Sequence, residues 1–368
     1  MSPILSTPNT SPTPTQPGHW IVTKFGPPSV LKWQTWDPLP SLTGTNVLVR
    51  IIVAGISGAD NIQRAGGYPH PSTTKPGFTT GYDFVGEVLA LGPSVPTNSN
   101  LAIGDRVVSL CTHGAHATHI VLPHEKLLRI DPSDDPVKIC ALPINYMTAW
   151  GMLKHSGVNL LPGSSILLGS ASGGLGTALA QLIDAFDLRI HIIGTCSPHK
   201  SEYVRSLGVE PIDRHAPDLV EQVRALTPGG RGVDVAYDMV CSEDSIAKSI
   251  AACKAEVGKV VVVGVMGEIA ADGSGISKSV KEILGERLVE PRVAFYALDI
   301  EFFKKEEGVR EFYDIVEKVR KGRLDPVVAR VLPLREAVEA HELLIDGRAV
   351  MGRMVFVVDG QLAARYGV

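Results

Sequence analysis

The stretch Ser165–Gln181 reads Ser-Ile-Leu-Leu-Gly-Ser-Ala-Ser-Gly-Gly-Leu-Gly-Thr-Ala-Leu-Ala-Gln, and it decides the fold of the chain. Its apolar run, Ile166–Leu168, is followed by a glycine turn and then by an Ala/Leu-rich segment with a helical pattern. A strand, a glycine turn and a helix in this order are typical of a site that binds the phosphates of a dinucleotide. The context of the turn has to support that interpretation, because glycine turns also serve packing alone.

The glycines of this turn have separate tasks. Gly173 lets the backbone come close to a pyrophosphate, and Gly176 lets the helix pack tightly on the strand. The pyrophosphate would rest on the N–H groups at the start of the helix. Ala171 stands where the usual fingerprint has its first glycine, so the match is Ala-x-Gly-x-x-Gly. The residues predicted to hold a dinucleotide here are Ser172, Gly173, Gly174, Leu175 and Gly176.

Length and composition indicate a globular protein of about two domains. The 368 residues exceed one ordinary core, and 44% of them are apolar. The formal net charge is −4 and the sequence has no long block of basic residues, so it shows no charge pattern that would favour binding to nucleic acid or an anionic membrane. The 5 cysteines form no Cys-x-x-Cys pair, which favours a reducing compartment. No apolar run approaches the roughly 20 residues of a membrane span. We therefore expect a cytoplasmic protein that binds neither nucleic acid nor membranes.

The pattern along the chain predicts four segments. Residues 1–18 are rich in Ser, Thr and Pro and lack the apolar core of a signal peptide, so they predict a disordered tail. Residues 19–135 carry short strand-like runs between Gly, Pro and Asn, which predict a mostly β domain. Residues 136–302 alternate apolar runs with helical segments, which favours a parallel, doubly wound sheet covered on both faces. Residues 303–368 begin with a helix and return to strand-like runs around a second one.

The middle segment predicts definite elements. Its apolar runs are expected to be the strands Ile166–Leu168, Ile190–Ile193, Pro211–Ile212, Val233–Tyr237 and Val260–Val263. The segments between them are expected to be the helices Gly174–Phe186, Lys200–Leu207, Asp218–Leu226 and Glu243–Ala252. A sheet of this kind binds its ligand at the carboxyl ends of the strands.

The end of the second strand indicates which dinucleotide binds. An acidic residue that grips the ribose 2′-hydroxyl of NAD should lie about 20 residues beyond the glycine motif. That position falls in Gly194–Lys200, which contains no carboxylate but offers Ser197 and Lys200 as donors. Arg214 follows the third strand and adds a second cation. Donors and cations without an acid fit a 2′-phosphate, so we predict NADPH as the cofactor. The alternative interpretation is that Lys200 only begins a solvated helix.

A metal site is not expected. His113, His116 and His119 are close in sequence, but zinc needs three or four ligands that converge on one point. On a strand, His113 and His119 would share a face and His116 would point away. No cysteine pair or carboxylate lies nearby in sequence to complete the set. These histidines are therefore interpreted as surface or core side chains that make ordinary hydrogen bonds and bind no metal.

An ordered series of motifs resembles the zinc-independent quinone oxidoreductase and enoyl reductase branch of the medium-chain dehydrogenase/reductase superfamily. The resemblance covers nearly the whole chain, from His19 to Val358. Its motifs, in order, are Phe25–Leu31, Val53–Asp60, Arg64–Pro69, Gly81–Gly86, Gly104–Val107, Gly232–Val235, Gly258–Val261, Gly347-Arg348-Ala349 and Gly352-Arg353. Zinc-dependent relatives carry Cys where Ser57 stands and a His-Glu pair where Tyr82-Asp83 stand. The resemblance implies a GroES-like β-barrel built from both chain ends, with a Rossmann-type domain inserted between them.

The resemblance also implies site residues. Tyr68 matches a catalytic or substrate-orienting tyrosine, and a phenol can donate a hydrogen bond or a proton to a developing enolate. The opposing interpretation is a loop aromatic packed against the barrel. Ser57 and Asp60 line the same segment and would orient substrate or cofactor, although Asp60 could equally cap a helix. Thr148, Gly264 and Val265 match segments that approach the nicotinamide in relatives.

The implied activity is the transfer of hydride from NADPH to a conjugated enone or a quinone without a metal. Two alternatives stay open. Gly194–His199 is similar to a stretch in fungal enoyl reductases that serve polyketide synthases, which would make the substrate an acyl thioester on a carrier protein or synthase. Ser57 and Ile62 replace the family's usual Asn and Tyr, which leaves room for a non-catalytic, crystallin-like protein. A homodimer through the edge strand Pro291–Leu298 is a further expectation.

Overall fold

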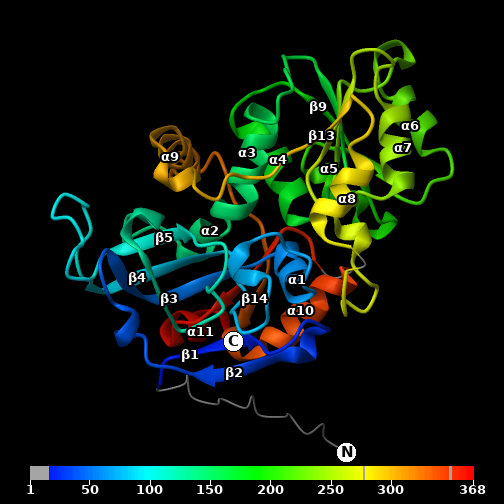
Figure 1. The fold of residues 1–368 in the computed structure, drawn as a ribbon. Helices are drawn as coiled ribbons and strands as arrows, with labels where there is room; N and C mark the ends of the chain where they lie inside the picture. The colour runs from blue at the N-terminus through cyan, green and yellow to red at the C-terminus, as the bar shows by residue number, and fades with distance from the viewer. Residues whose placement is uncertain (1–15, 277, 348–349) are drawn as a thin grey trace, which may run out of the picture.

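The chain folds into two units that lie one above the other in Figure 1. The computed structural model describes residues 16–276, 278–347 and 350–368. The lower unit combines blue and cyan strands from the start of the chain with red strands from its end, and the upper unit holds the green and yellow middle of the chain (Figure 1). The fold class predicted from the sequence, a Rossmann-type sheet inserted into a GroES-like barrel, is confirmed.

The upper unit is built on a six-stranded parallel sheet with the order β10-β9-β8-β11-β12-β13. Its strands are β8 (Ser165–Leu168), β9 (His191–Cys196), β10 (Glu210–Asp213), β11 (Val235–Asp238), β12 (Lys259–Val262) and β13 (Val293–Phe295). The order reverses direction between β8 and β11, and the glycine turn follows β8 directly. Ligands of open α/β sheets bind at such a switch point, outside the carboxyl ends of the strands.

Helices cover both faces of this sheet, as its buried strands require. They are α3 (Met147–Lys154), α4 (Gly174–Ala185), α5 (Ser201–Ser206), α6 (Leu219–Ala225), α7 (Glu243–Ala252) and α8 (Val280–Arg287). Two further helices, α2 (Pro136–Cys140) and α9 (Glu306–Arg320), lie towards the lower unit, and α2 packs against strands of that unit (Figure 1). The predicted helix Glu243–Ala252 has the observed bounds. The predicted start of a helix at Lys200 is early by one residue, because Pro198–Lys200 forms a 3-10 turn before α5.

The lower unit contains a seven-stranded sheet with the order β14-β15-β3-β4-β5-β7, in which β6 also pairs with β3. Its strands are β3 (Asn46–Ile56), β4 (Asp83–Leu91), β5 (Arg106–Leu110), β6 (His119–Pro123), β7 (Leu127–Arg129), β14 (Val328–Pro333) and β15 (Arg353–Val357). A separate hairpin joins β1 (Gly18–Val22) and β2 (Leu31–Thr35), and the helices are α1 (Gly58–Arg64), α10 (Ala337–Asp346) and α11 (Gly360–Tyr366).

The two ends of the chain meet within the lower sheet. Strand β15 pairs antiparallel with β3, from Met354 opposite Ile56 to Val357 opposite Val53. The side chains of β3 are almost all buried, as expected of a continuous apolar strand covered on both faces. Of the predicted tail, residues 1–15 lie outside the described part of the chain, and Gly18 already belongs to β1. The predicted domain boundaries remain predictions.

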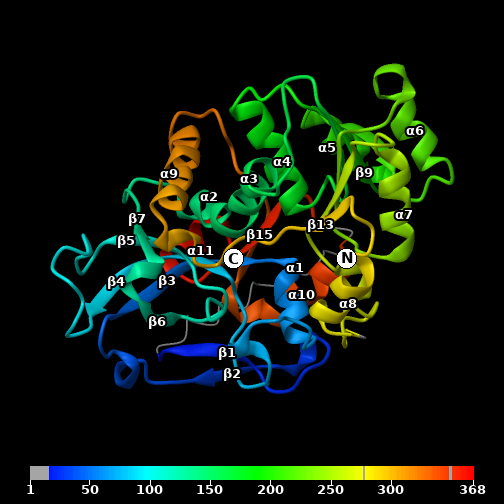
Figure 2. The ribbon, with the colours of Figure 1, turned by 45° about the horizontal axis from the view of Figure 1, so that its top comes forward.

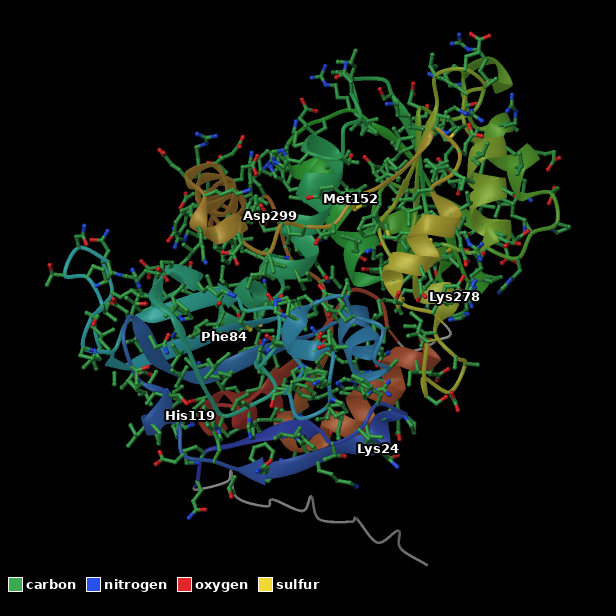
Figure 3. The ribbon with its side chains drawn as sticks, in the orientation of Figure 1. Lys24, Phe84, His119, Met152, Lys278 and Asp299 are labelled. Carbon is green, nitrogen blue, oxygen red and sulfur yellow. The ribbon has the colours of Figure 1, made fainter. Side chains whose placement is uncertain are left out.

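The junction of the two units is formed by α1, by the segments next to it and by the start of β15. Figure 2 shows α1 beside α10, and the side chains of Met152 in α3 and Phe84 in β4 are labelled on either side of the junction in Figure 3. Gly352 donates its N–H to the carbonyl oxygen of Ser172 over 3.1 Å, which ties the glycine turn to β15. Across the described residues, each helix is too short or too polar to pass through a lipid bilayer.

Candidate active site

The glycine turn adopts the geometry that a phosphate site requires. Gly173 is the N-cap of α4 and provides no side chain to cap the first N–H groups of the helix. A Cβ on Gly174 would lie 2.3 Å from Asn145 Nδ2, and one on Gly176 would lie 2.7 Å from Ala171 Cα. Backbone contact therefore requires glycine at 176, and the Asn145 side chain disfavours a larger residue at 174. The uncapped helix start and the absence of side chains fit the pyrophosphate of a dinucleotide.

A buried ionic network supports this turn from the lower unit. Arg353 Nη1 donates to Asn145 Oδ1 over 3.1 Å, and Arg353 Nη2 donates to Asp83 Oδ1 over 2.5 Å. Asp83 Oδ2 accepts the N–H of Ile144 over 3.0 Å. Burial raises the pKa of Asp83 to about 6, against the opposing effect of the Arg353 guanidinium. The network connects β4 and β15 with the segment that contacts Gly174, so it positions the glycine turn.

The three predicted 2′-phosphate residues come together at the ends of β9 and β10. The Arg214 N–H donates to the carbonyl of Cys196 over 3.0 Å, which places Arg214 beside Ser197. The Arg214 side chain is exposed, whereas Lys200 is buried. Lys200 Nζ donates to the carbonyls of Gly347 over 2.7 Å and Val350 over 3.0 Å, and burial lowers its pKa. Lys200 therefore joins the upper unit to the segment before β15. The exposed Arg214 side chain is more accessible to a ligand than the Lys200 ammonium.

The residues predicted to approach the nicotinamide occupy two places around the turn. Thr148 is buried in α3, one helical turn beyond Asn145. Gly264 and Val265 follow β12, and a Cβ on Gly264 would lie 3.1 Å from the carbonyl oxygen of Met239. The next residue, Met266, crosses to the lower unit, where its sulfur would lie 3.2 Å from a Cβ on Gly58. This contact brings the segment after β12 against the start of α1.

Ser57 and Asp60 form a capping box at the start of α1. Asp60 Oδ2 accepts the Ser57 N–H over 2.7 Å, and the Ser57 hydroxyl lies 3.2 Å from the same oxygen. Asp60 Oδ1 accepts the N–H of Gly81 over 2.8 Å, so the fully buried carboxylate also fixes the turn before β4. These contacts are those of a helix cap, which is the alternative role that the sequence offered for Asp60. A direct role of Ser57 or Asp60 towards a ligand stays a prediction.

Tyr68 lies at the meeting point of the two hydrophobic cores. It is partly buried and packs against residues of the core around the glycine turn and of the core that includes Val265. Its ring meets the ring of Tyr82 edge to face, with centroids 5.6 Å apart and an angle of 85°. Burial raises the pKa of Tyr68. The side chain is therefore neutral near pH 7 and able to donate a hydrogen bond.

The histidines of the His113–His119 segment have separate partners. His116 Nε2 donates to the carbonyl oxygen of Gly55 over 3.0 Å, and its Nδ1 lies 2.8 Å from Thr80 Oγ1. His119 Nδ1 lies 2.9 Å from Thr118 Oγ1, and His119 is the member of this segment that lies in a strand. Within residues 16–276, 278–347 and 350–368, no group of three His, Cys, Asp or Glu side chains has the geometry of a metal site.

Sequence reasoning missed Asn145 and the roles of Asp83 and Arg353. Asp83 and Arg353 fall within the motifs Gly81–Gly86 and Gly352-Arg353 that carry the family resemblance, but nothing in one sequence pairs two residues that are 270 positions apart. The sequence did offer one indication: Asp83 and Arg353 each stand at the start of an otherwise apolar strand, where a buried charge needs a partner. Asn145 gives no comparable indication, because a single Asn in an apolar helical segment usually makes only ordinary hydrogen bonds.

Comparisons with known proteins agree with this geometry. The family described as "Alcohol dehydrogenase GroES-like domain" matches residues 43–132, and the family described as "Zinc-binding dehydrogenase" matches residues 207–356. A 2-haloacrylate reductase from Burkholderia sp is 31% identical over 351 residues, which cover 92% of this chain and 98% of that protein. The chain therefore belongs to the medium-chain dehydrogenase/reductase superfamily, and it is an oxidoreductase with a nicotinamide-dinucleotide-binding fold.

Solved structures extend the comparison. A quinone oxidoreductase from Pseudomonas syringae superimposes with a TM-score of 0.76 at 25% identity, covering 93% of this chain and all 100% of that one. A mycobacterial protein solved as a complex with NADPH has a TM-score of 0.76 at 24% identity, covering 92% of this chain and 99% of that one. At this identity the second likeness establishes the fold alone.

Proposed function

We propose that this protein is an NADPH-dependent reductase that works without a metal and transfers hydride to the electron-poor carbon of a conjugated enone or quinone. The observation that carries the proposal is the position of Tyr68, whose side chain packs against the core that includes Ile62 of α1 and Val265 after β12. A donor at that place can bind the oxygen of an activated carbonyl while the electron-poor carbon conjugated to it faces the nicotinamide side of the site.

Each part of the chain has a defined task in this proposal. Bound NADPH would supply the hydride, and the glycine turn with the uncapped start of α4 would hold its pyrophosphate. Arg214 and Ser197 would receive the 2′-phosphate. Tyr68 would donate a hydrogen bond to the substrate oxygen and stabilise the negative charge that grows there. Tyr68 is partly buried against apolar side chains, and a hydrogen bond is stronger in such surroundings than in water.

We propose a reaction without a metal because of the side chains that stand where zinc-dependent relatives carry their zinc ligands. Ser57 stands where zinc-dependent relatives carry Cys, and Tyr82 stands where they carry His. The Ser57 hydroxyl is engaged with Asp60 and is a poor ligand for zinc compared with a thiolate. An alcohol cannot be activated there by a Lewis acid, whereas a conjugated acceptor needs only a donor on its oxygen. The relative from Burkholderia sp is a 2-haloacrylate reductase, and a haloacrylate is a conjugated acceptor, which supports this choice.

The test is NADPH oxidation by the full-length chain with a panel of small enones, quinones and enoyl thioesters, before and after treatment with EDTA. We expect turnover of at least one free enone or quinone, unchanged by the chelator. If only enoyl thioesters bound to a carrier protein are reduced, the substrate is a biosynthetic intermediate and not a free enone or quinone. Tight NADPH binding without turnover of any member would overturn the proposal in favour of a non-catalytic, crystallin-like role.

A further inference from the structure

Ser170 is a residue of the glycine turn whose conformation and side chain the proposed function leaves unexplained. Its φ is +53°, in the left-handed region that residues other than Gly, Asn and Asp rarely adopt. A serine in this conformation costs free energy that a glycine would not cost. Residues held in such conformations are concentrated at ligand sites, where the surrounding structure maintains them. The side chain of Ser170 therefore needs a reason, and its surroundings indicate one.

Backbone contacts on both sides hold Ser170 in place. Its N–H donates to Thr195 Oγ1 over 3.3 Å, near the carboxyl end of β9. Its carbonyl oxygen accepts the N–H of Gly173 over 2.9 Å and would lie 2.6 Å from a Cβ on Gly176. These contacts fix Ser170 between the ends of β8 and β9 and the start of α4. The fold therefore maintains the unfavourable conformation at the place where the pyrophosphate is expected.

The hydroxyl of Ser170 lies beside the N-cap residue of α4. A Cβ on that residue, Gly173, would lie 3.2 Å from Ser170 Oγ. The Ser170 side chain is exposed, and in the part of the chain that the structure describes its hydroxyl takes part in no hydrogen bond. A serine hydroxyl often caps a helix, but no side chain caps the start of α4. The hydroxyl is therefore free to donate to a ligand at this helix start.

We propose that Ser170 is a cofactor-binding residue: its hydroxyl donates a hydrogen bond to a pyrophosphate oxygen of the nicotinamide dinucleotide at the start of α4. A hydrogen bond to a charged oxygen is stronger than one between neutral groups, and this gain offsets the cost of the positive φ. The glycine motif itself supplies only backbone groups, whereas Ser170 adds a side chain. The inference rests on the proposed function, because it needs the pyrophosphate at the glycine turn.

The first test compares cofactor affinity with stability. Ser170→Ala removes the hydroxyl alone, and Ser170→Gly also removes the backbone strain. We expect both variants to bind NADPH and NADH about tenfold more weakly, and equally so, because both cofactors contain the pyrophosphate. Without cofactor, Ser170→Gly should nevertheless unfold at the same temperature as the wild type or a higher one, because glycine adopts this φ freely. Fluorescence titration and thermal unfolding measure the two effects.

Arg189→Gly is the matched control. Arg189 has a φ of +55° and an exposed side chain, and it precedes β9 at the end of that strand away from the glycine turn. We expect this variant to bind both cofactors as the wild type does. Wild-type affinity in either Ser170 variant, or a loss confined to NADPH, would overturn the inference. A wild-type protein that binds neither cofactor would contradict both the inference and the proposed function.

The second test observes the phosphates directly. In the 31P NMR spectrum of NADPH bound to the full-length protein, the pyrophosphate and the 2′-phosphate give separate resonances. We expect Ser170→Ala to move the pyrophosphate resonances and to leave the 2′-phosphate resonance in place, whereas Arg189→Gly should move neither. Unmoved pyrophosphate resonances in Ser170→Ala contradict the inference. Moved pyrophosphate resonances in a protein that reduces no enone or quinone support the role of Ser170 and contradict the proposed reductase activity.

Discussion

At the residue scale, the two cations at the ends of β9 and β10 differ in what they are free to do. Lys200 is buried and its ammonium donates to two backbone carbonyls, whereas Arg214 is exposed and its Nε lies 3.1 Å from the ring of His215. A guanidinium binds a phosphate through two parallel hydrogen bonds, which suits it to a 2′-phosphate. The sequence predicted both residues for this role, and because the Lys200 ammonium is already engaged, we propose Arg214 as the main donor.

The corresponding prediction concerns cofactor preference. Arg214→Ala should weaken NADPH binding about 10- to 100-fold, the range of one hydrogen bond between charged groups, and should leave NADH binding within about twofold. Lys200→Ala should weaken both cofactors to a similar extent, because it loosens the connection to the segment before β15. Fluorescence titration with each cofactor measures the effect. Equal weakening of NADPH and NADH by Arg214→Ala would show that no 2′-phosphate site lies here.

A second residue-scale prediction concerns acid stability. His341 is fully buried and accepts a hydrogen bond from Arg64 Nε over 3.3 Å, and its ring lies 5.7 Å from that of His116. Burial lowers the pKa of His341 well below 6.5, and that of His116 is lowered as well. The unfolded chain therefore binds a proton below pH 6.5 that the folded chain does not, so stability is lost as the pH falls below that value.

Urea unfolding between pH 7.5 and 5 measures this effect. We expect His341→Gln to make the dependence on pH shallower, by up to about 1.4 kcal/mol per pH unit for one proton. The control His199→Gln changes an exposed side chain and should leave the slope as it is in the wild type. A slope in His341→Gln that equals the wild-type slope would mean that this histidine does not control acid unfolding.

At the element scale, the glycine turn is the feature that sequence reasoning placed most completely. The apolar run, the glycines and the Ala/Leu-rich helix are local, and together they predict β8, the turn and α4 to within a residue or two. Strand β13 was placed less well: the predicted edge strand Pro291–Leu298 has only Val293–Phe295 in the sheet. The ends of such an edge strand depend on tertiary contacts, here the packing of Tyr296 on Gly151 in α3.

The glycine turn gives a matched pair of substitutions. Gly174→Ala would place a Cβ 2.3 Å from Asn145 Nδ2, so either the start of α4 shifts or Asn145 gives up its hydrogen bond with Arg353, which supports the turn. We expect NADPH affinity to fall about tenfold or more. Gly285→Ala lies in α8 with no heavy atom within 4 Å, and it should raise stability by about 0.5–1 kcal/mol without an effect on binding. Unchanged NADPH affinity in Gly174→Ala would remove the phosphate role of this turn.

The contact between Gly151 and Tyr296 is a prediction at the same scale. A Cβ on Gly151 would overlap the Tyr296 hydroxyl oxygen at 1.6 Å, so Gly151→Ala must displace the segment after β13. We expect a loss of about 1–3 kcal/mol in the free energy of unfolding, the usual cost of overpacking. In the double variant with Tyr296→Phe, which shortens the side chain, part of that loss should be recovered. Equal stability of Gly151→Ala and the wild type in urea would show that the segment does not dock on α3.

At the scale of the whole molecule, β13 forms the open edge of the nucleotide-binding sheet, and we propose that a second copy of the chain pairs with it. Val289 and Phe295 beside this edge are 77% and 39% exposed. Light scattering during gel filtration should give twice the 39.3 kDa of one chain, and Phe295→Asp should give the monomer. Ile103→Asp, in the lower unit and 68% exposed in the wild type, should leave the dimer intact. A wild-type monomer at micromolar concentration would contradict this pairing.

The arrangement of the two units was predicted from the family resemblance, whose motifs run in a fixed order along the chain. The pairing of β15 with β3 and the Asp83–Arg353 contact were not predictable from local patterns, since they join residues from the two ends. The same limit applies to Tyr82. Its place next to Tyr68 depends on how the Gly81 turn packs against Asp60 and His116, which no spacing in the sequence reports.

The most direct measurement of the central claim follows the hydride itself. The full-length protein is treated with EDTA, supplied with NADPH deuterated at C4 on one face or the other, and given a conjugated enone. We predict a product with one deuterium on the carbon β to the carbonyl, from one of the two labelled cofactors and not from the other. A product without deuterium from either cofactor, or a reaction that stops until zinc is added, would contradict metal-free hydride transfer at this site.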